Sequence, residues 1–318
     1  MLSPVEALAL IDDRDGVGVL FGVPVLAVAV DETRACAELA RRASQLPCVF
    51  VAVGARRPGA PGLDVEVSGA DELAVLVAAI ERSPEASVAL VQLLRLGEQL
   101  DLAAALVAES IVYGLLQSGA RFRTWLADQP VRAHLDVDAP VAVERVGATL
   151  TCTLARPRVR NAFDAATRDA LVEALAMASA DPTIARVELR GVGADFCSGG
   201  DLSEFGHTPD PLVGHLVRTT RSAASAMASI AERTTAFVHG ACIGAGIELP
   251  AFAGRLVASP DTRISLPEVE MGLIPGAGGT VSLARRMGRQ RTAWMALTGA
   301  TIDAATALDW GLVDQIEA

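Results

Sequence analysis

The chain has 318 residues, a hydrophobic content of 51% and a formal net charge of −11. This length and apolar content allow one large or two modest domains with filled cores. The acidic charge excludes a general nucleic-acid binder, because neutralising phosphates requires a basic face. All 27 basic residues are arginine, so lysine Schiff-base chemistry and a P-loop lysine are excluded as well.

Nothing in the chain indicates export or a membrane. The N-terminus lacks a basic segment before its apolar residues, so it does not resemble a secretory signal. The most apolar run, 17–30, is interrupted by Gly22 and Pro24 and is shorter than the roughly 18–20 residues that a membrane helix needs. The five cysteines show no CxxC or metal-ligand spacing. We therefore expect a soluble, cytoplasmic protein with reduced thiols and no metal.

The first 135 residues read as an N-terminal α/β layer followed by a helical segment. Apolar, β-rich runs predict strands at 23–30, 48–53, 63–67 and 88–94. Helical patterns fill 33–44 and the stretch from Ser68 or Asp71 to Glu81, and the Pro/Gly-rich 55–62 predicts an exposed loop. Residues 99–126 are strongly helical with a break at Gly119, and 130–140 resembles a linker.

From Val141 the pattern restarts as a second α/β unit. A hairpin around Gly147 is followed by a helix that Asp164 can cap and that ends near Ser179. The remaining elements expected before residue 240 are a strand at 185–189, a glycine-rich turn at 190–202, a helix at 211–231 and a strand at 235–238.

Two glutamates, Glu248 and Glu268, stand twenty positions apart next to glycine-rich segments at 240–246 and 276–279. Glycine lets main-chain N–H groups approach a ligand closely, because no Cβ is in the way. Two carboxylates beside such turns point to acid–base chemistry on a substrate that backbone donors hold.

Several motifs in a fixed order carry a family resemblance. They are RPRVRNAFD at 156–164, GADFCSGGDL at 193–202, HGACIGAGIEL at 239–249, LPEVEMGLIPGAGGT at 266–280 and LTGATIDAATALDWGLVDQI at 297–316. In these segments the chain resembles the crotonase (enoyl-CoA hydratase/isomerase) superfamily over about residues 140–318. The resemblance implies an α/β fold with a core spiral of ββα turns in a domain of residues 136–318, preceded by an extension of residues 1–135.

The same resemblance implies an oxyanion hole for an acyl thioester carbonyl, with N–H groups from Gly200 and Ala245. Many members carry glycine where this chain has Ala245, and an N–H donor survives that change. CoA is implied as part of the substrate and no separate cofactor is expected. The family's CoA contacts fall on Arg158, Arg160, Ala162, Ala194, Phe196 and Ser198.

Glu248 and Glu268 fall on the positions that are both glutamate in hydratases of the family. Adding water across a conjugated double bond requires one group to take a proton and another to deliver one, whereas one carboxylate suffices to shift a double bond. The pair therefore favours hydration of a 2-enoyl-CoA over isomerisation, and a carrier-protein thioester is an alternative substrate. The family also implies a homotrimer or a dimer of trimers.

Two departures leave other functions open. Family members usually continue past residue 316 with further helices, and residues 109–126 resemble the N-terminal region of the dihydroxyphenylacetyl-CoA dioxygenase branch. The second hypothesis is therefore a cofactor-independent dioxygenase or a thioesterase acting on an aryl- or acyl-CoA. The third is a non-catalytic partner subunit, motivated by Ala245 and the shortened C-terminus.

Overall fold

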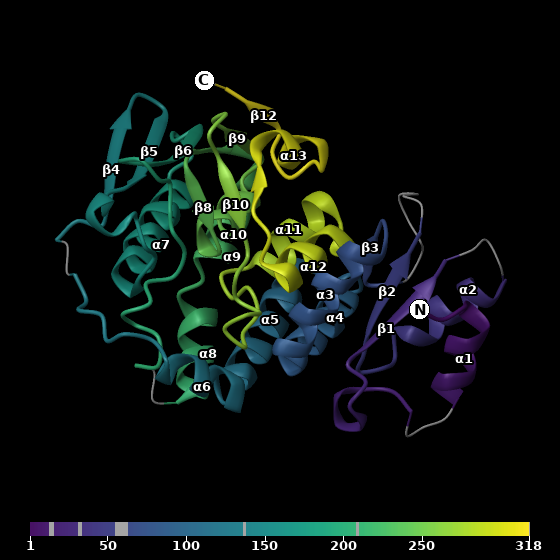
Figure 1. Cartoon of the computed structure of the whole chain (residues 1–318). Helices are drawn as coiled ribbons and strands as arrows, with labels where there is room; N and C mark the ends of the chain where they lie inside the picture. Colours follow the sequence, from purple (N-terminus) through teal and green to yellow (C-terminus); the bar gives the residue numbers. More distant parts are fainter. Residues whose placement is uncertain (13–15, 31–33, 55–62, 136–137, 208–209, 318) are drawn as a thin grey trace.

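The protein was analysed as a computed structural model, which describes all residues except 13–15, 31–33, 55–62, 136–137, 208–209 and 318. The fold is α/β, as predicted, with helices packed on three sheets (Figure 1). The loop predicted at 55–62 lies outside the described residues. No single helix of the described residues is long and apolar enough to span a bilayer. Helices α5 (Leu102–Gln117) and α6 (Ala120–Ala127) meet that test only as a pair bent by 64°.

The N-terminal layer is a parallel three-stranded sheet in the order β1-β2-β3. Its strands lie inside the ranges predicted from the sequence: β1 is Val25–Ala29, β2 is Val49–Val53 and β3 is Val65–Val67. Every residue of the central strand β2 is buried, which matches its uninterrupted apolar sequence VFVAV. Helices α1 (Pro4–Asp12) and α2 (Arg34–Ala43) pack against each other beside it.

The strand predicted at 88–94 is wrong, because this segment belongs to helix α4 (Pro84–Gly97). Its exposed side is narrow and carries only two polar residues, Glu85 and Gln92, beside the apolar Ala89 and Leu96, so the sequence shows little of the polar face that marks a helical period. Pro84 stands in the first turn of α4, where a missing N–H costs nothing. Helix α3 (Ala70–Arg82) precedes it directly, so two helices replace the predicted helix and strand.

The helical segment predicted at 99–126 is confirmed, including its break. Helix α5 (Leu102–Gln117) is capped by Asp101, whose carboxylate accepts the Ala104 N–H at 2.8 Å. Helix α6 (Ala120–Ala127) follows after Gly119. The predicted helix at 211–231 is divided into α8 (Pro211–Thr220) and α9 (Ala223–Ser229). Ser222 caps the second of these helices, because its hydroxyl accepts the Ser225 N–H.

The C-terminal part is built on two further sheets. One has the order β12-β9-β7-β6-β5-β4 and is parallel apart from the β4–β5 hairpin; the other has the order β11-β10-β8. The strands are β4 (Val141–Val146), β5 (Thr149–Leu154), β6 (Arg186–Gly191), β7 (Thr234–Val238), β8 (Ala241–Ile243), β9 (Arg255–Ala258), β10 (Arg263–Ser265), β11 (Ile302–Asp303) and β12 (Gln315–Ile316).

Helices connect and cover these strands. They are α7 (Ala165–Ala180), α10 (Ala245–Glu248), α11 (Gly279–Met287), α12 (Arg289–Thr298) and α13 (Ala304–Asp309). Four short 3₁₀ turns complete the described elements: η1 (Val19–Phe21), η2 (Pro157–Val159), η3 (Ala231–Arg233) and η4 (Pro250–Phe252).

The helices of the first 135 residues pack directly on the C-terminal part. Helices α3, α4 and α5 lie against α11 and α12, blue against yellow in Figure 1. One continuous hydrophobic core includes Leu76 and Leu90 from the N-terminal side and Leu283 and Met295 from the C-terminal side. The proposed boundary at residue 135 therefore separates two parts that share a core, and helix α5 reaches the predicted active site.

Candidate active site

Two backbone turns that carry the predicted oxyanion-hole residues lie directly against each other. The Cys197 N–H donates to Ala241 O at 3.1 Å, and the Ile243 N–H donates to Cys197 O at 3.0 Å. A Cβ on Gly246 would collide with Cys197 O, so only glycine permits this approach. The two turns are therefore fixed relative to each other by main-chain contacts.

The N–H groups of Gly200 and Ala245 are both available to a ligand. Within the part of the chain that the structure describes, neither donates to a backbone or side-chain acceptor. Ala245 is the first residue of α10, where an N–H has no partner inside the helix. Gly244 precedes it with φ +50°, a backbone conformation that residues other than glycine rarely adopt. The predicted pair of donors is thus placed on two adjoining turns.

Glu248 ends α10 and is only 2% exposed. Its Oε2 accepts the Ala277 N–H at 2.7 Å and the Gly279 N–H at 2.9 Å, both in the turn that begins α11. An added methyl at Gly279 would lie 2.6 Å from Glu248 Cγ, so the glycine-rich sequence at 276–279 is needed for this contact. One carboxylate oxygen is therefore held by the backbone, which leaves Oε1 for other contacts.

Glu268 follows β10 and turns its carboxylate toward the same place. A methyl added at Gly244 would collide with Glu268 Oε1 and would lie 3.7 Å from Glu248 Oε1. Both Oε1 atoms therefore face one point above Gly244, next to Ala245. Glu268 Oε2 is fully enclosed and has no hydrogen-bond partner among the described residues.

Both carboxyl groups hold protons more strongly than an exposed glutamate does. Burial raises the pKa of Glu268 to about 7, and the charge of Glu109 adds to this. Burial, and then the charges of Glu268 and Glu109, raise the pKa of Glu248 well above its ordinary value, against the lowering effect of its two N–H donors. Because the two groups interact, they titrate together, and near neutral pH the pair can hold one proton. That state offers one acid and one base.

Sequence analysis missed two residues that α5 brings to this site. Glu109 is 2% exposed and accepts the N–H groups of Gly278 and Thr280 at 2.7 and 3.0 Å. Tyr113, one helical turn later, covers Gly276, where an added Cβ would collide with its ring. Burial, followed by the charges of Glu268 and Glu248, raises the pKa of Tyr113, so its phenol lies within electrostatic reach of the pair. The available signal was Glu109 itself, the one charged residue in the sequence of α5.

The predicted CoA-contact residues differ widely in exposure. Arg158, Arg160 and Ala194 are exposed, Ser198 is partly buried, and Ala162 and Phe196 are buried. Phe196 is 1% exposed and its N–H donates to His239 O, so neither its side chain nor its N–H is available to CoA. Arg160 pairs with Asp195 at 2.7 Å, which occupies part of its guanidinium. These six positions remain predictions.

Asn161 connects the two turns that carry the predicted CoA-contact residues, one at 158–162 and the other at 194–198. It follows Arg160, and both residues adopt φ values above +50°, a conformation that is costly outside glycine. The Asn161 side chain accepts the Arg156 N–H at 2.8 Å and donates to Val192 O and Asp195 O at 2.8 and 3.0 Å. Asparagine tolerates this backbone conformation better than most residues, which explains its use here.

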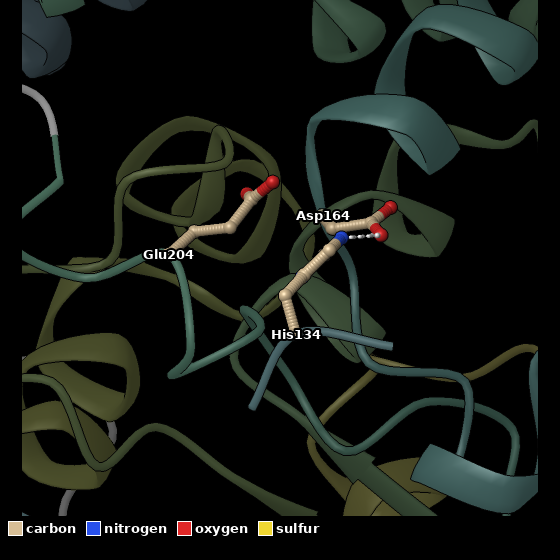
Figure 2. Close-up of side chains that lie close together, drawn as sticks. All are labelled: His134, Asp164 and Glu204. Atoms are coloured by element: carbon tan, nitrogen blue, oxygen red, sulfur yellow. Dashed lines mark ion pairs between the residues drawn. The ribbon is translucent and has the colours of Figure 1, made fainter. Parts of the chain in front are cut away.

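A cluster of His134, Asp164 and Glu204 lies at the N-terminus of α7 (Figure 2). His134 Nε2 lies 3.6 Å from Asp164 Oδ2, and all three residues bring a potential metal-ligand atom within 4.8 Å of the others. Both Glu204 oxygens, however, accept the Ala165 N–H, at 3.1 and 3.0 Å. Asp164 caps α7 and pairs with the buried Arg156 at 3.0 Å. The carboxylates thus already have helix donors and a guanidinium, so we interpret this cluster as a helix cap.

Arg156 connects that cap to the oxyanion-hole turn. Its guanidinium, 1% exposed, also pairs with Asp201 at 3.1 Å and donates to Leu135 O at 2.9 Å. Asp201 follows Gly200, and its N–H donates to Phe163 O at 3.0 Å. Leu135 of the predicted linker, the start of α7 and the Gly200 turn are therefore held by one buried cation.

Comparison with known proteins agrees with this geometry. The family described as "Enoyl-CoA hydratase/isomerase" matches residues 144–318. Mevalonyl-coenzyme A hydratase SIDH of Beauveria bassiana is 33% identical over 198 residues, covering 59% of this chain and 69% of that protein. The 2,3-dehydroadipyl-CoA hydratase of Escherichia coli is 34% identical over 174 residues, covering 55% and 68%. The chain belongs to the enoyl-CoA hydratase/isomerase family.

Solved structures give the same result for the fold. The enoyl-CoA hydratase of Mycobacterium smegmatis superposes with a TM-score of 0.52 and 30% identity, covering 57% of this chain and 71% of that one. The predicted crotonase-like fold is confirmed, and the chain is an enzyme of the hydratase/isomerase kind. The family match begins at residue 144, so the N-terminal similarity to the dioxygenase branch remains a prediction.

Proposed function

We propose that this enzyme hydrates a 2-enoyl-CoA thioester at the site between Glu248 and Glu268. The observation that carries the proposal is the convergence of the two Oε1 atoms on one point above Gly244, beside the free Ala245 N–H. A water molecule at that point would contact both carboxyl groups. The relatives named as mevalonyl-CoA and 2,3-dehydroadipyl-CoA hydratases support the reaction class.

The reaction follows from these positions. The ionised carboxylate of the pair takes a proton from water, and the water oxygen bonds to the β-carbon of the enoyl group. The π electrons move toward the thioester, so that negative charge develops on its carbonyl oxygen. The protonated carboxyl then delivers its proton to the α-carbon, which completes the addition without any separate cofactor.

The Gly200 and Ala245 N–H groups stabilise the charge that develops on the carbonyl oxygen. Preorganised donors of this kind each contribute about 2.7–4 kcal/mol to the transition state in comparable sites. CoA is part of the substrate here, and Arg158 and Arg160 are the exposed cations next to the predicted CoA turns. A carrier-protein thioester would present the same reacting atoms.

A second candidate function is oxygenation or hydrolysis of an aryl- or acyl-CoA. It is favoured by Glu109 and Tyr113, which add a carboxyl and a phenol beside the pair. A non-catalytic binding subunit is the third candidate, and burial of two carboxylates beside free N–H donors argues against it, because a scaffold gains nothing from that cost.

One experiment separates these functions. The purified protein is incubated with a panel of enoyl-, acyl- and arylacetyl-CoAs in buffer made with ¹⁸O-labelled water, and the products are analysed by mass spectrometry. Hydration predicts gain of one water that carries ¹⁸O, with the thioester intact. Unlabelled oxygen in the product, release of free CoA or binding without conversion would each overturn the hydratase proposal and select a different candidate.

A further inference from the structure

Residues 277–280, which lead into helix α11, present four consecutive N–H groups that two different carboxylates share. Glu248 accepts the first and third, from Ala277 and Gly279, at 2.7 and 2.9 Å. Glu109 accepts the second and fourth, from Gly278 and Thr280, at 2.7 and 3.0 Å. The Thr280 hydroxyl adds a third donor to Glu109 at 2.6 Å. Neither glutamate can shift along this turn without disturbing the donors of the other.

Glu109 comes from outside the segment that matches the family. It lies on α5, whereas the family match begins at residue 144. Its partners are about 170 residues away in the chain, at separations of 169 and 171. The N-terminal part thus supplies a buried carboxylate to the turn that holds a predicted catalytic group of the C-terminal part.

We propose that Glu109 is a positioning residue of the active site: it fixes the 277–280 turn on Glu248 and extends to higher pH the range in which the Glu248–Glu268 pair retains its single proton. The kinetic part of this inference rests on the proposed hydration. The structural part, that Glu109 controls protonation of the pair, does not depend on which reaction the pair catalyses.

The surroundings of Glu109 support an electrostatic role. Besides Glu248 and Glu268, the titratable and charged groups near it are Tyr113 on the same helix and Arg218 and His215 on α8. Arg218 donates to Ser110 Oγ and O, at 3.0 and 3.1 Å, and lies over the Tyr113 ring at 4.7 Å, so it binds α5 at the residue next to Glu109. The Glu109 carboxylate itself accepts from the 277–280 turn, which also holds Glu248.

The direction of the effect follows from charge. Burial raises the pKa of Glu109 to about 7, against the lowering effect of its three donors and Arg218. Above that pH Glu109 is ionised, and its negative charge opposes loss of the last proton from the pair. Below that pH Glu109 is neutral and has little influence. Glu109 should therefore act on the alkaline limb of the pH profile more than on the acid limb.

The main test is a pH titration that needs no substrate. The glutamate carboxyl carbons are labelled with ¹³C and followed by NMR in wild type and Glu109→Gln, with the Glu248 and Glu268 signals assigned from their own Gln variants. We expect the signals of the pair to titrate at lower pH in Glu109→Gln. Glu85→Gln, which removes an exposed carboxylate from α4, is the matched control and should change nothing. Superposed titration curves in folded Glu109→Gln and wild type would overturn the inference.

A second pair of variants decides the matter if Glu109→Gln does not fold. Thr280→Val removes one of the three donors to Glu109 and leaves the carboxyl in place, whereas Thr280→Ser retains the hydroxyl. In Thr280→Val the Glu109 signal should titrate at higher pH and the pair at lower pH, and Thr280→Ser should match wild type. If the Glu248 and Glu268 signals titrate at the same pH in Thr280→Val as in Thr280→Ser, the role of Glu109 is contradicted.

The kinetic readout separates this inference from the proposed function. If hydration is observed, the alkaline limb of kcat/KM should move to lower pH in Glu109→Gln, and each unit of movement lowers kcat/KM tenfold at pH values above the limb. An equal loss at every pH would mean a purely structural effect and would overturn the electrostatic role. Absence of hydration in the wild type together with a shifted NMR titration would refute the proposed function and support the role of Glu109.

Discussion

Replacing Glu268 by glutamine should make the protein more stable, relative to wild type, at pH 8 than at pH 5. Burial raises the pKa of Glu268 from 4.5 to about 7 on folding. A carboxyl with a raised pKa contributes stability that is fully present below its unfolded pKa and is lost as the pH rises through the folded value. Ionising Glu268 at pH 8 therefore destabilises the folded state, and glutamine removes that penalty because it does not ionise.

The size of the effect follows from the shift. At about 1.4 kcal/mol per pKa unit, raising the pKa from 4.5 to about 7 corresponds to roughly 3 kcal/mol of unfolding free energy between pH 4.5 and pH 8. Glu268 Oε2 has no hydrogen-bond partner among the described residues, so the substitution breaks no bond there, and any local cost of the new amide is the same at both pH values. Relative to wild type, Glu268→Gln should therefore be roughly 2–3 kcal/mol more stable at pH 8 than at pH 5.

The assay is urea unfolding at pH 5 and pH 8, followed by tryptophan fluorescence, for wild type, Glu268→Gln and Glu270→Gln. Glu270 is exposed and stands two positions away, so its glutamine variant controls for the change in net charge. Parallel pH dependences of the unfolding free energy in wild type and Glu268→Gln would refute the claim that this carboxyl is buried with a raised pKa.

Two further substitutions test the site and its support. Gly244→Ala and Gly147→Ala both place a side chain at a positive φ, but only at Gly244 does the new methyl collide with Glu268. Turnover should therefore fall in Gly244→Ala alone, and equal activities of the two variants would contradict the geometry of the pair. Arg156→Leu removes the buried cation that pairs with Asp164 and Asp201, so the unfolding free energy measured with urea should fall by about 3–5 kcal/mol. Arg158→Leu, which removes an exposed arginine, is the control, and equal stability of the two variants would contradict the role given to Arg156.

Local sequence signals predicted the parts of the fold that depend on short-range chemistry. The strands at 25–29 and 49–53 are apolar and β-rich, and the break between α5 and α6 falls at Gly119, as expected. The strand predicted at 88–94 was wrong because the exposed face of this helix carries too few polar residues to show a helical period, with Leu96 exposed beside Gln92. Tertiary packing, not local pattern, determined that element.

The same distinction applies to the site. Glu248 and Glu268 stand beside glycine-rich segments that are visible in the sequence, so the sequence alone is enough to propose them. Glu109 could not be proposed in this way, because its function depends on contacts with Gly278 and Thr280 across about 170 residues of chain. A carboxylate in an apolar helix indicates a buried partner, but the sequence does not identify which one.

The central claim is that Glu248 and Glu268 act as the acid–base pair of a hydration reaction. It is tested most directly by steady-state hydration of a 2-enoyl-CoA that the wild type accepts, measured for Glu248→Gln, Glu268→Gln and the exposed control Glu270→Gln. Loss of a positioned acid or base typically costs on the order of 10²–10⁴ in rate, so each of the first two variants should lose at least that factor while remaining folded. Glu270→Gln should match wild type. Near-wild-type turnover in folded Glu248→Gln or Glu268→Gln would contradict the account.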